Sequence, residues 1–271
     1  MPTVAISPTH HLHYLETNSE GADPVVLLHG LGVNGASWEL QFPALTQGGF
    51  RTLAPDMRGF GHSSYPGEAS VQAMAEDVAT FIRTLASSRA HVVGISMGGA
   101  VALQLAVDAP ACIERLVLVN TFAELRPKTL SSWLYFVQRM VLIHTLGLGV
   151  QAELVARRIF PYPHQTAERD AYREQVRLAN PKAYRATMRG FLRYSVMGQL
   201  ANIPHKTLVV TSIDDTTVPP INQSVIAERI PHARQVEIPA SGHAVSVDNP
   251  DVFNAVLLGF LTEPDERAPA A

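Results

Sequence analysis

Short apolar runs alternate with longer amphipathic segments along most of the chain. The runs in the middle of the series are apolar at nearly every position, which is typical of strands that are covered on both faces. The first two runs lie close together and predict an antiparallel hairpin at a sheet edge. The strands predicted in this way cover residues 4–6, 11–15, 25–28, 51–54, 91–95, 116–119, 207–211 and 235–238.

Apolar residues at helical spacing fill the intervals between these runs. The clearest case is 250–261, and segments 71–85 and 97–109 follow the same pattern. Regular alternation of strand and helix implies right-handed crossovers and parallel strands. We therefore predict an α/β fold with a mostly parallel eight-stranded sheet and helices on both faces.

The alternation stops between residues 119 and 207, where only helical patterns occur. In open parallel sheets, ligands bind at the carboxyl edge of the strands, and an insertion here is suited to cover that edge. We expect an α/β core formed by residues 1–121 and 201–271, with a helical cap at 122–200 inserted after strand six. The tail after Leu261 is rich in Pro, Ala and charge and is expected to be disordered.

Composition is that of an ordinary globular protein, with 271 residues, 46% hydrophobic and 17% charged. The net charge of −3 indicates no nucleic-acid or anionic-membrane partner. Residues 121–200 nevertheless contain 12 Lys and Arg against 5 Asp and Glu. A solvated basic face is the favoured interpretation, and the alternative is that one or two arginines bind a substrate carboxylate. The cap arginines are Arg126, Arg139, Arg157, Arg158, Arg169, Arg173, Arg177, Arg185, Arg189 and Arg193.

The first residues lack the basic and apolar runs of a signal peptide, and the apolar stretch at 140–150 is too short to span a bilayer. Cys112 is the one cysteine, so an intrachain disulfide is impossible. We expect a cytoplasmic protein without a membrane partner. The histidines His10, His11 and His13 are expected on a solvated edge-strand face without partner carboxylates, rather than in a metal site.

The strongest chemical signal is Gly94-Ile95-Ser96-Met97-Gly98-Gly99, which matches G-x-S-x-G between a predicted strand and a predicted helix. A nucleophilic serine on such a tight turn has its hydroxyl exposed, and side chains two positions away on either side would collide with the turn. The helix start also directs backbone N–H groups toward an incoming oxyanion. Ser96 is therefore the predicted nucleophile.

A second segment, residues 25–32, is a buried strand that runs into His29-Gly30-Leu31-Gly32. It resembles the H-G-x-G loop of the α/β-hydrolase superfamily. The resemblance implies an oxyanion hole made by the main-chain N–H groups of Leu31 and Met97. We expect a structural role for His29, because a better-placed base exists.

That base is His243, which lies between the last predicted strand and the final helix. The chain order of such enzymes is serine, acid, histidine, so the acid is expected after the strand at 207–211. Residues 212–219 resemble the family's G-x-x-D-x-x-x-P pattern with Asp215 as the acid, although Ser212 stands where the pattern has Gly. Asp214 stays open as the alternative. The stretch from Asp56 to Ser63 is similar to a further family motif, D-x-R-G-x-G-x-S, and is interpreted as a structural turn.

Among the superfamily, the chain resembles the serine carboxylesterase and enol-lactonase branch. This implies cleavage of a small carboxylic ester or lactone through an acyl-enzyme on Ser96, without metal or organic cofactor. Haloalkane dehalogenases and epoxide hydrolases are disfavoured, because they carry Asp where Ser96 stands. The candidate substrate pocket contains Trp133, Phe136, Val218 and Val245, and helix packing is the alternative role for the two aromatic residues.

Three other functions remain open at this point. One is hydrolysis of a carbon–carbon bond in a vinylogous diketone. Enzymes of that kind are associated with an aromatic residue beside the catalytic histidine, and Ala244 and Val245 do not match this feature. The second is cofactor-free haloperoxidase or perhydrolase activity with the same triad. The third is a ligand receptor with slow turnover. The sequence does not determine the oligomeric state.

Overall fold

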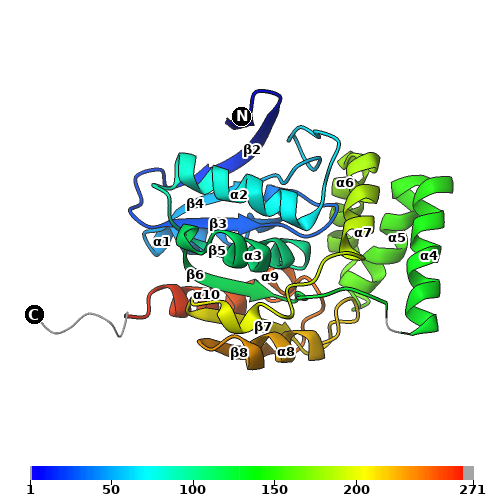
Figure 1. The fold of residues 1–271 in the computed structure, drawn as a ribbon. Coiled ribbons are helices and arrows are strands. Elements are labelled where there is room, and N and C mark those ends of the chain that lie inside the picture. Colours follow the sequence, from blue (N-terminus) through cyan, green and yellow to red (C-terminus); the bar gives the residue numbers. More distant parts are fainter. Residues whose placement is uncertain (1, 128, 265–271) are drawn as a thin grey trace, which may run out of the picture.

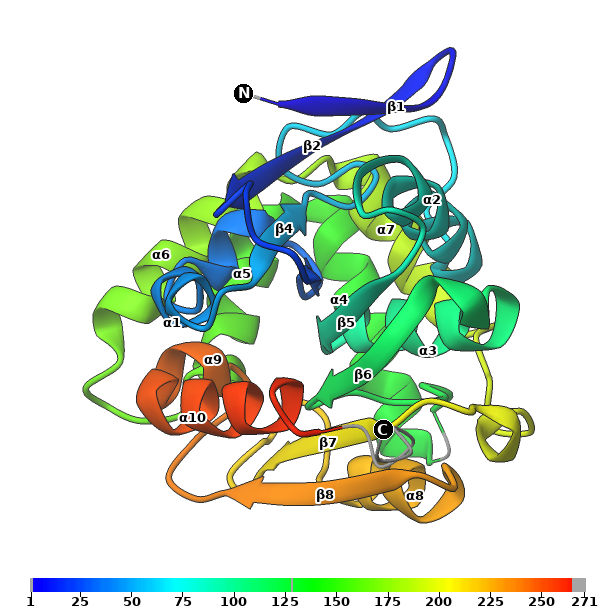
Figure 2. The same cartoon turned by 90° about the vertical axis from the view of Figure 1, so that its left-hand side faces the viewer.

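The computed structural model describes residues 2–127 and 129–264, with only the backbone of Ser131. Within these ranges, eight strands form one sheet in the order β1-β2-β4-β3-β5-β6-β7-β8 (Figures 1 and 2). The six strands from β4 to β8 in this order are parallel to one another, whereas β2 is antiparallel to both β1 and β4. Every predicted strand is present, and the edge hairpin is confirmed. The bounds are β1 Thr3–Ser7, β2 His10–Thr17, β3 Pro24–Leu28, β4 Arg51–Pro55, β5 Ala90–Ile95, β6 Ile113–Val119, β7 Thr207–Ser212 and β8 Ala233–Ile238.

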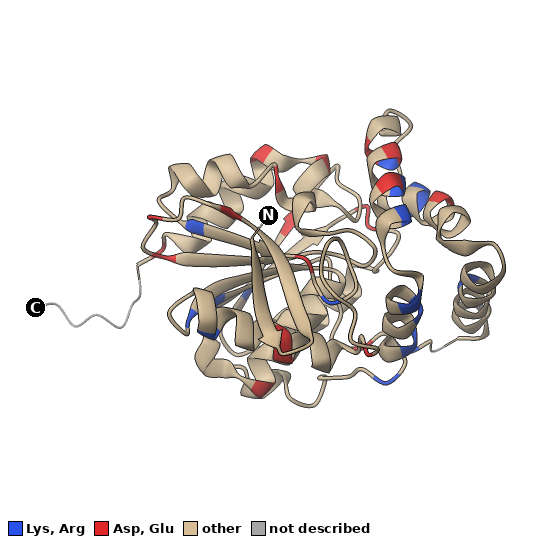
Figure 3. Cartoon of the chain, turned by 90° about the horizontal axis from the view of Figure 1, so that it is seen from above, with Lys and Arg blue, Asp and Glu red and all other residues tan. Residues whose placement is uncertain are grey.

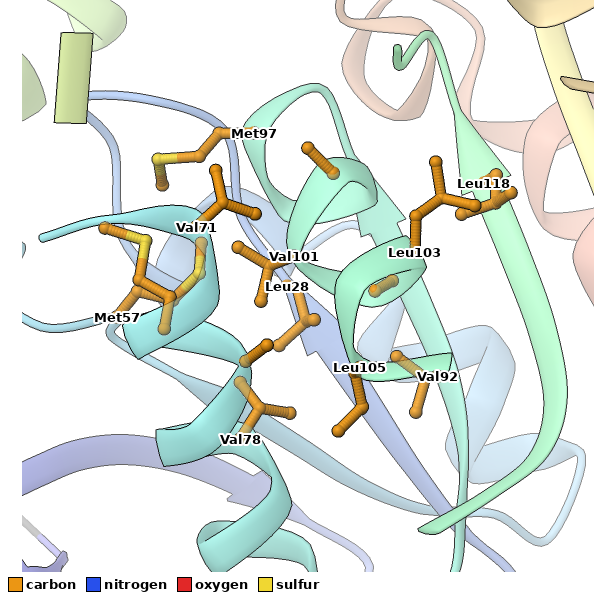
Figure 4. Close-up of a cluster of buried hydrophobic side chains, with 14 of the residues drawn as sticks. Leu28, Met57, Val71, Val78, Val92, Met97, Val101, Leu103, Leu105 and Leu118 are labelled. Atoms are coloured by element: carbon orange, nitrogen blue, oxygen red, sulfur yellow. The ribbon is translucent and has the colours of Figure 1, made fainter. Parts of the chain in front are cut away.

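The sheet separates two apolar cores. Along β3, Val25 and Leu27 pack on one face, and Val26 and Leu28 pack on the other, as the twofold side-chain period of a strand requires. Figure 4 shows the second face, where Val101 of a covering helix lies beside Leu28. The helices on this face are α2 (Val71–Leu85), α3 (Met97–Asp108) and α8 (Ile221–Arg229), and those on the opposite face are α1 (Phe42–Gln47) and α10 (Pro250–Leu261).

The predicted helices at 71–85 and 250–261 have the observed bounds, and α3 ends one residue earlier than predicted. Helix α2 begins after Ser70, whose side chain accepts a hydrogen bond from the Ala73 N–H at 3.2 Å. Short elements complete the core: the one-turn helix α9 (Val245–Asp248) and the 3₁₀ turns Gly35–Trp38, Pro110–Cys112 and Leu200–Asn202.

Four helices lie between β6 and β7, and Figure 1 shows them beyond the carboxyl ends of the strands. After Phe191 the chain leaves helical geometry and turns back toward the sheet. There the Val196 N–H donates to the Ala123 carbonyl at 2.9 Å. The division into core and cap at 122–200 remains a prediction. The four helices are α4 (Leu130–Thr145), α5 (Gly147–Ile159), α6 (Thr166–Leu178) and α7 (Pro181–Phe191).

The expectation of a solvated face was wrong for His10 and His13, whereas His11 is exposed as expected. His10 and His13 are buried, and each has a carboxylate partner: His10 Nε2 lies 2.9 Å from Asp77, and His13 Nδ1 lies 2.8 Å from Asp56. Asp77 belongs to α2 and Asp56 follows β4, so the inward side of β2 is covered by that helix and by the loop after β4. Across the described ranges, no group of three or more His, Cys, Asp or Glu side chains is arranged to hold a metal ion.

Residues 262–264, which were expected to belong to a disordered tail, are placed against the core. Glu263 forms ion pairs with Lys206 at 3.3 Å and Arg234 at 2.5 Å, and residues 265–271 lie outside the described residues. Cys112 is buried. In the part of the chain that the structure describes, no helix combines the length and apolar character needed to cross a membrane.

Candidate active site

Ser96 lies on a sharp turn between β5 and α3, in a backbone conformation that side chains rarely adopt (φ 54°, ψ −116°). Both flanking glycines are required by close backbone approach. A Cβ atom on Gly94 would lie 2.3 Å from the Gly98 carbonyl oxygen, and one on Gly98 would lie 2.1 Å from the Leu28 carbonyl oxygen. The Ser96 N–H donates to the Val119 carbonyl at 2.9 Å, which fixes the turn on the neighbouring strand. The predicted strand-to-helix turn is confirmed.

The loop after β3 lies directly beside this turn. A Cβ on Gly30 would lie 3.8 Å from Ser96 Cβ. The main-chain N–H groups of Leu31 and Met97 donate to no other described residue, so both are free to meet an oxyanion. His29 is buried and stabilises this loop: its Nδ1–H donates to the Gly30 carbonyl at 2.8 Å, and its Nε2 accepts from the Met57 N–H at 2.9 Å. Burial lowers the pKa of His29, consistent with a neutral structural imidazole.

His243 and Asp215 meet at the carboxyl edge of the sheet. The Nδ1–H of His243 donates to Asp215 Oδ2 at 2.7 Å, and the two residues are 5% and 6% exposed. The other oxygen of Asp215 accepts from the N–H groups of Thr217 at 2.7 Å and Val218 at 3.0 Å, so the carboxylate is fully bonded. The alternative acid, Asp214, is exposed and instead accepts from Tyr162 Oη at 2.6 Å. The geometry therefore pairs His243 with Asp215.

Asn120 holds the acid and base loops together, and the sequence analysis did not identify it. It follows β6 at φ 43° and is fully buried. Its amide nitrogen donates to Ser212 Oγ and to the His243 carbonyl, both at 2.8 Å, and its amide oxygen accepts from the Ser212 N–H at 2.8 Å. An Asn immediately after a buried strand, with its tolerance of positive φ, was the available sequence signal.

A second unrecognised residue, Asp248, fixes the backbone before the histidine. Its carboxylate accepts from the Gly242 N–H at 2.7 Å and from the Gln165 amide at 2.6 Å. Burial raises the pKa of Asp248 to about 6, and the hydrogen bonds from Gly242 and Gln165 act in the opposite direction. The His243 N–H donates to the Ile159 carbonyl of α5 at 3.1 Å. The histidine loop is thus tied to the inserted helices as well as to the sheet.

Ser96 and His243 line one cavity of about 630 Å³, roofed by the inserted helices. Of the predicted pocket residues, Phe136 and Val218 belong to its wall. Trp133 does not, because it lies on the outer side of α4 and is 46% exposed. Val245 does not either, because it points into the apolar core beneath the sheet and is 0% exposed. Its neighbours Ala244, Ser246 and Val247 line the cavity instead.

The cavity wall is predominantly apolar with a few polar groups, as small-molecule sites usually are. Apolar side chains from the inserted helices and the strand-end loops include Leu31, Val33, Phe122, Val155, Phe160, Met188 and Phe191. The site can therefore hold a small organic molecule beside Ser96 and His243.

The chain is similar to a known protein family and to proteins of several bacteria. The family described as alpha/beta hydrolase fold matches residues 23–250. A protein of Variovorax paradoxus (strain S110) named "Putative carbamate hydrolase RutD" is 35% identical over 259 residues, which cover 92% of this chain and 96% of that protein. A protein of the same name from Pantoea ananatis is 33% identical over 253 residues, covering 89% of this chain and 88% of its own length.

Two solved structures resemble the chain over nearly its whole length. The enol-lactonase from Burkholderia xenovorans LB400 has a TM-score of 0.87 and 29% identity, and covers 97% of this chain and all of its own (100%). A hydrolase from Pseudomonas aeruginosa PA01 has a TM-score of 0.88 and 29% identity, with 97% of this chain and 98% of its own covered. With the family match, these relatives identify the chain as a hydrolase that belongs to the α/β-hydrolase fold family.

Proposed function

We propose that this chain is a serine hydrolase that cleaves a small carboxylic ester or lactone through an acyl-enzyme on Ser96. The observation that carries the proposal is the 2.7 Å hydrogen bond between His243 Nδ1 and the buried Asp215, in a cavity that also contains the serine of the strained turn. This bond leaves His243 Nε2 as the ring nitrogen available to a hydroxyl. A serine hydroxyl is a weak nucleophile at neutral pH and needs such a base.

The reaction then follows from the position of each group. Ser96 Oγ attacks the substrate carbonyl carbon while His243 Nε2 takes its proton, and the negative oxygen of the tetrahedral intermediate accepts from the N–H groups of Leu31 and Met97. The imidazolium returns the proton to the leaving alcohol as the intermediate collapses to the acyl-enzyme. Water repeats the sequence and releases the acid. Asp215 keeps the Nδ1–H tautomer and stabilises the imidazolium throughout.

The test compares wild-type protein with Ser96→Ala and Ser37→Ala. Ser37 lines the same cavity but lies outside the turn, so it is the matched control. We expect a serine-directed fluorophosphonate to label the wild type and Ser37→Ala but not Ser96→Ala. Turnover of short-chain methyl esters should fall by about three orders of magnitude or more in Ser96→Ala. Near-complete turnover in Ser96→Ala would show that the nucleophile is another group.

Carbamate hydrolysis is a second candidate, favoured by the name of the Variovorax and Pantoea relatives. A carbamate carbonyl can be attacked by the same serine, but nitrogen lone-pair donation makes it less electrophilic than an ester carbonyl. A panel of esters, lactones and carbamates of matched size separates the two candidates by kcat/KM. Continued turnover over many cycles would separate either enzyme from a receptor that is modified once.

A further inference from the structure

The wall of the catalytic cavity has an excess of positive charge. Three arginines from the inserted segment line it, Arg126, Arg139 and Arg158, against one acidic residue, Glu168. None of the three arginines forms an ion pair with a carboxylate among the described residues, whereas Arg157, Arg173 and Arg177 nearby all do. Figure 3 shows basic and acidic residues along these helices. Of these six arginines, the three at the cavity are therefore without a carboxylate partner in the described part of the chain, and the three away from it are paired.

Arg139 is held rigidly by neutral partners. Its Nη2 donates to Tyr184 Oη at 3.1 Å, and its Nε and Nη2 face the amide oxygen of Gln151 at 2.5 and 3.1 Å when that amide is turned toward the guanidinium. Gln151 and Tyr184 are both almost completely buried. These bonds use one edge of the guanidinium and leave the Nη1 donors without a partner among the described residues. A guanidinium oriented in this way, with donors to spare, is suited to bind an oxyanion.

A second arginine stands close to the first. The Tyr135 ring has the guanidinium carbon of Arg158 at 4.5 Å and that of Arg139 at 5.8 Å from its centroid. Cation–π contact holds both cations near one aromatic ring without neutralising either. Arg158 is exposed and Arg139 is partly buried, so Arg158 lies nearer the cavity rim than Arg139. Burial disfavours the charge on Arg139, but Tyr184, Tyr135 and Tyr172 raise its pKa, so it remains a cation at physiological pH.

We propose that Arg139, assisted by Arg158, binds a carboxylate on the substrate at a distance from the scissile bond, so that the preferred substrate is an anionic ester or lactone. This inference rests on the proposed esterase function and specifies its substrate class. A preference for a cationic substrate would instead arise from Glu168, whose Oε2 is buried and has no hydrogen-bond partner among the described residues. We favour the anion, because the cavity wall has three arginines against one glutamate.

The test uses three methyl esters of matched acyl length that differ in the distal group. Methyl pentanoate is neutral, monomethyl glutarate carries a distal carboxylate, and methyl 4-(trimethylammonio)butanoate carries a distal cation. Acid release is followed in a pH-stat. We expect wild-type kcat/KM to be at least about tenfold higher for monomethyl glutarate than for the neutral ester, and lowest for the cation. Equal values for the neutral and anionic esters, or preference for the cationic ester, would overturn the proposal.

Variants locate the effect. Arg139→Gln should lower kcat/KM for monomethyl glutarate by about 10- to 100-fold and that for methyl pentanoate by less than about twofold. Arg139→Lys should retain part of the preference for monomethyl glutarate. Arg158→Gln should lower kcat/KM for monomethyl glutarate by a few-fold. The control is Arg157→Gln, an exposed residue that is paired with Glu153 and does not line the cavity. An equal loss on both esters in Arg139→Gln and Arg139→Lys would mean that the residue only supports the fold.

A binding measurement separates this proposal from the proposed function. Calorimetry with Ser96→Ala and monomethyl glutarate reports anion recognition without turnover, and Arg139→Gln in that background should abolish the heat of binding. If no ester is hydrolysed but this binding persists, the hydrolytic proposal fails and the anion site stands. If esters are hydrolysed but Arg139 does not affect the glutarate preference or binding, the anion site alone fails.

Discussion

Asn120 is the most informative position at which to perturb the site without touching a reacting atom. Its side chain joins β6 to the loops of both Asp215 and His243 through hydrogen bonds of 2.8 Å to Ser212 Oγ, the Ser212 N–H and the His243 carbonyl. Its backbone has a φ of 43°, which Asn and Gly tolerate and Ala does not. Asn120→Gly removes only the hydrogen bonds, whereas Asn120→Ala also imposes backbone strain.

The expected magnitude follows from these contacts. Each lost hydrogen bond costs about 1 kcal/mol, and each buried group left unpaired costs about 1–3 kcal/mol. We therefore expect Asn120→Gly to lower the free energy of unfolding by about 3–5 kcal/mol, and Asn120→Ala to lower it by about 1 kcal/mol more. Displacing the histidine loop by about 1 Å should also lower kcat/KM by about 100-fold.

The assay is reversible urea unfolding, with ester hydrolysis measured on the same samples. Asn18→Gly is the matched control, since Asn18 also has a positive φ of 51° but lies away from the cavity and donates one hydrogen bond, to the Phe50 carbonyl. That variant should lose at most about 1 kcal/mol and keep full activity. The reasoning would be refuted if Asn120→Gly were as stable and active as Asn18→Gly.

Three further predictions concern other parts of the same machinery. Asp215→Asn should reduce kcat by about 10⁴-fold with a nearly unchanged melting temperature, because the amide supports the wrong imidazole tautomer; a small change in rate would remove Asp215 from the mechanism. Gly98→Ala should destabilise the fold by more than about 3 kcal/mol in urea unfolding, because its Cβ would lie 2.1 Å from the Leu28 carbonyl oxygen. The control Gly259→Ala, whose Cβ would have no atom within 4 Å, should be neutral or stabilising by up to about 1 kcal/mol. Similar values for both variants would contradict the steric argument. Because the pKa of Asp248 is raised to about 6 in the fold, the folded state holds this proton longer than the unfolded chain, and this group's contribution to stability falls as pH rises from about 4 to about 6. Asp248→Asn lacks that contribution, so its stability relative to wild type should increase by about 1–2 kcal/mol over this window, after allowance for solvent screening; a constant difference in urea unfolding across the window would contradict the raised pKa.

The sequence alone determined those features that depend on a few consecutive residues. Strands and core helices could be predicted because apolar spacing follows the period of each element. The turn at Ser96 could be predicted because Gly94 and Gly98 are the residues that its backbone contacts tolerate. His243 and Asp215 could be proposed from chain order and spacing, and the structure brings these two side chains together.

Only the tertiary structure decided which side chains meet across long separations. Asp214 and Asp215 are neighbours in sequence, but their side chains point in different directions after β7. Asp215 binds His243, and Asp214 binds Tyr162. Trp133 and Val245 are apolar and were therefore suitable for a pocket wall. Trp133 faces solvent, however, and Val245 packs into the core on the opposite face of the sheet.

The same limit applies to charge. Ten cap arginines were equivalent in the sequence, and pairing with nearby carboxylates in three dimensions distinguishes Arg157, Arg173 and Arg177 from those at the cavity. Asn120 contacts residues more than 90 positions away, which no local pattern records. Local backbone preference and hydrophobic period are encoded in short segments, whereas burial, pairing and the orientation of polar groups depend on where distant segments pack.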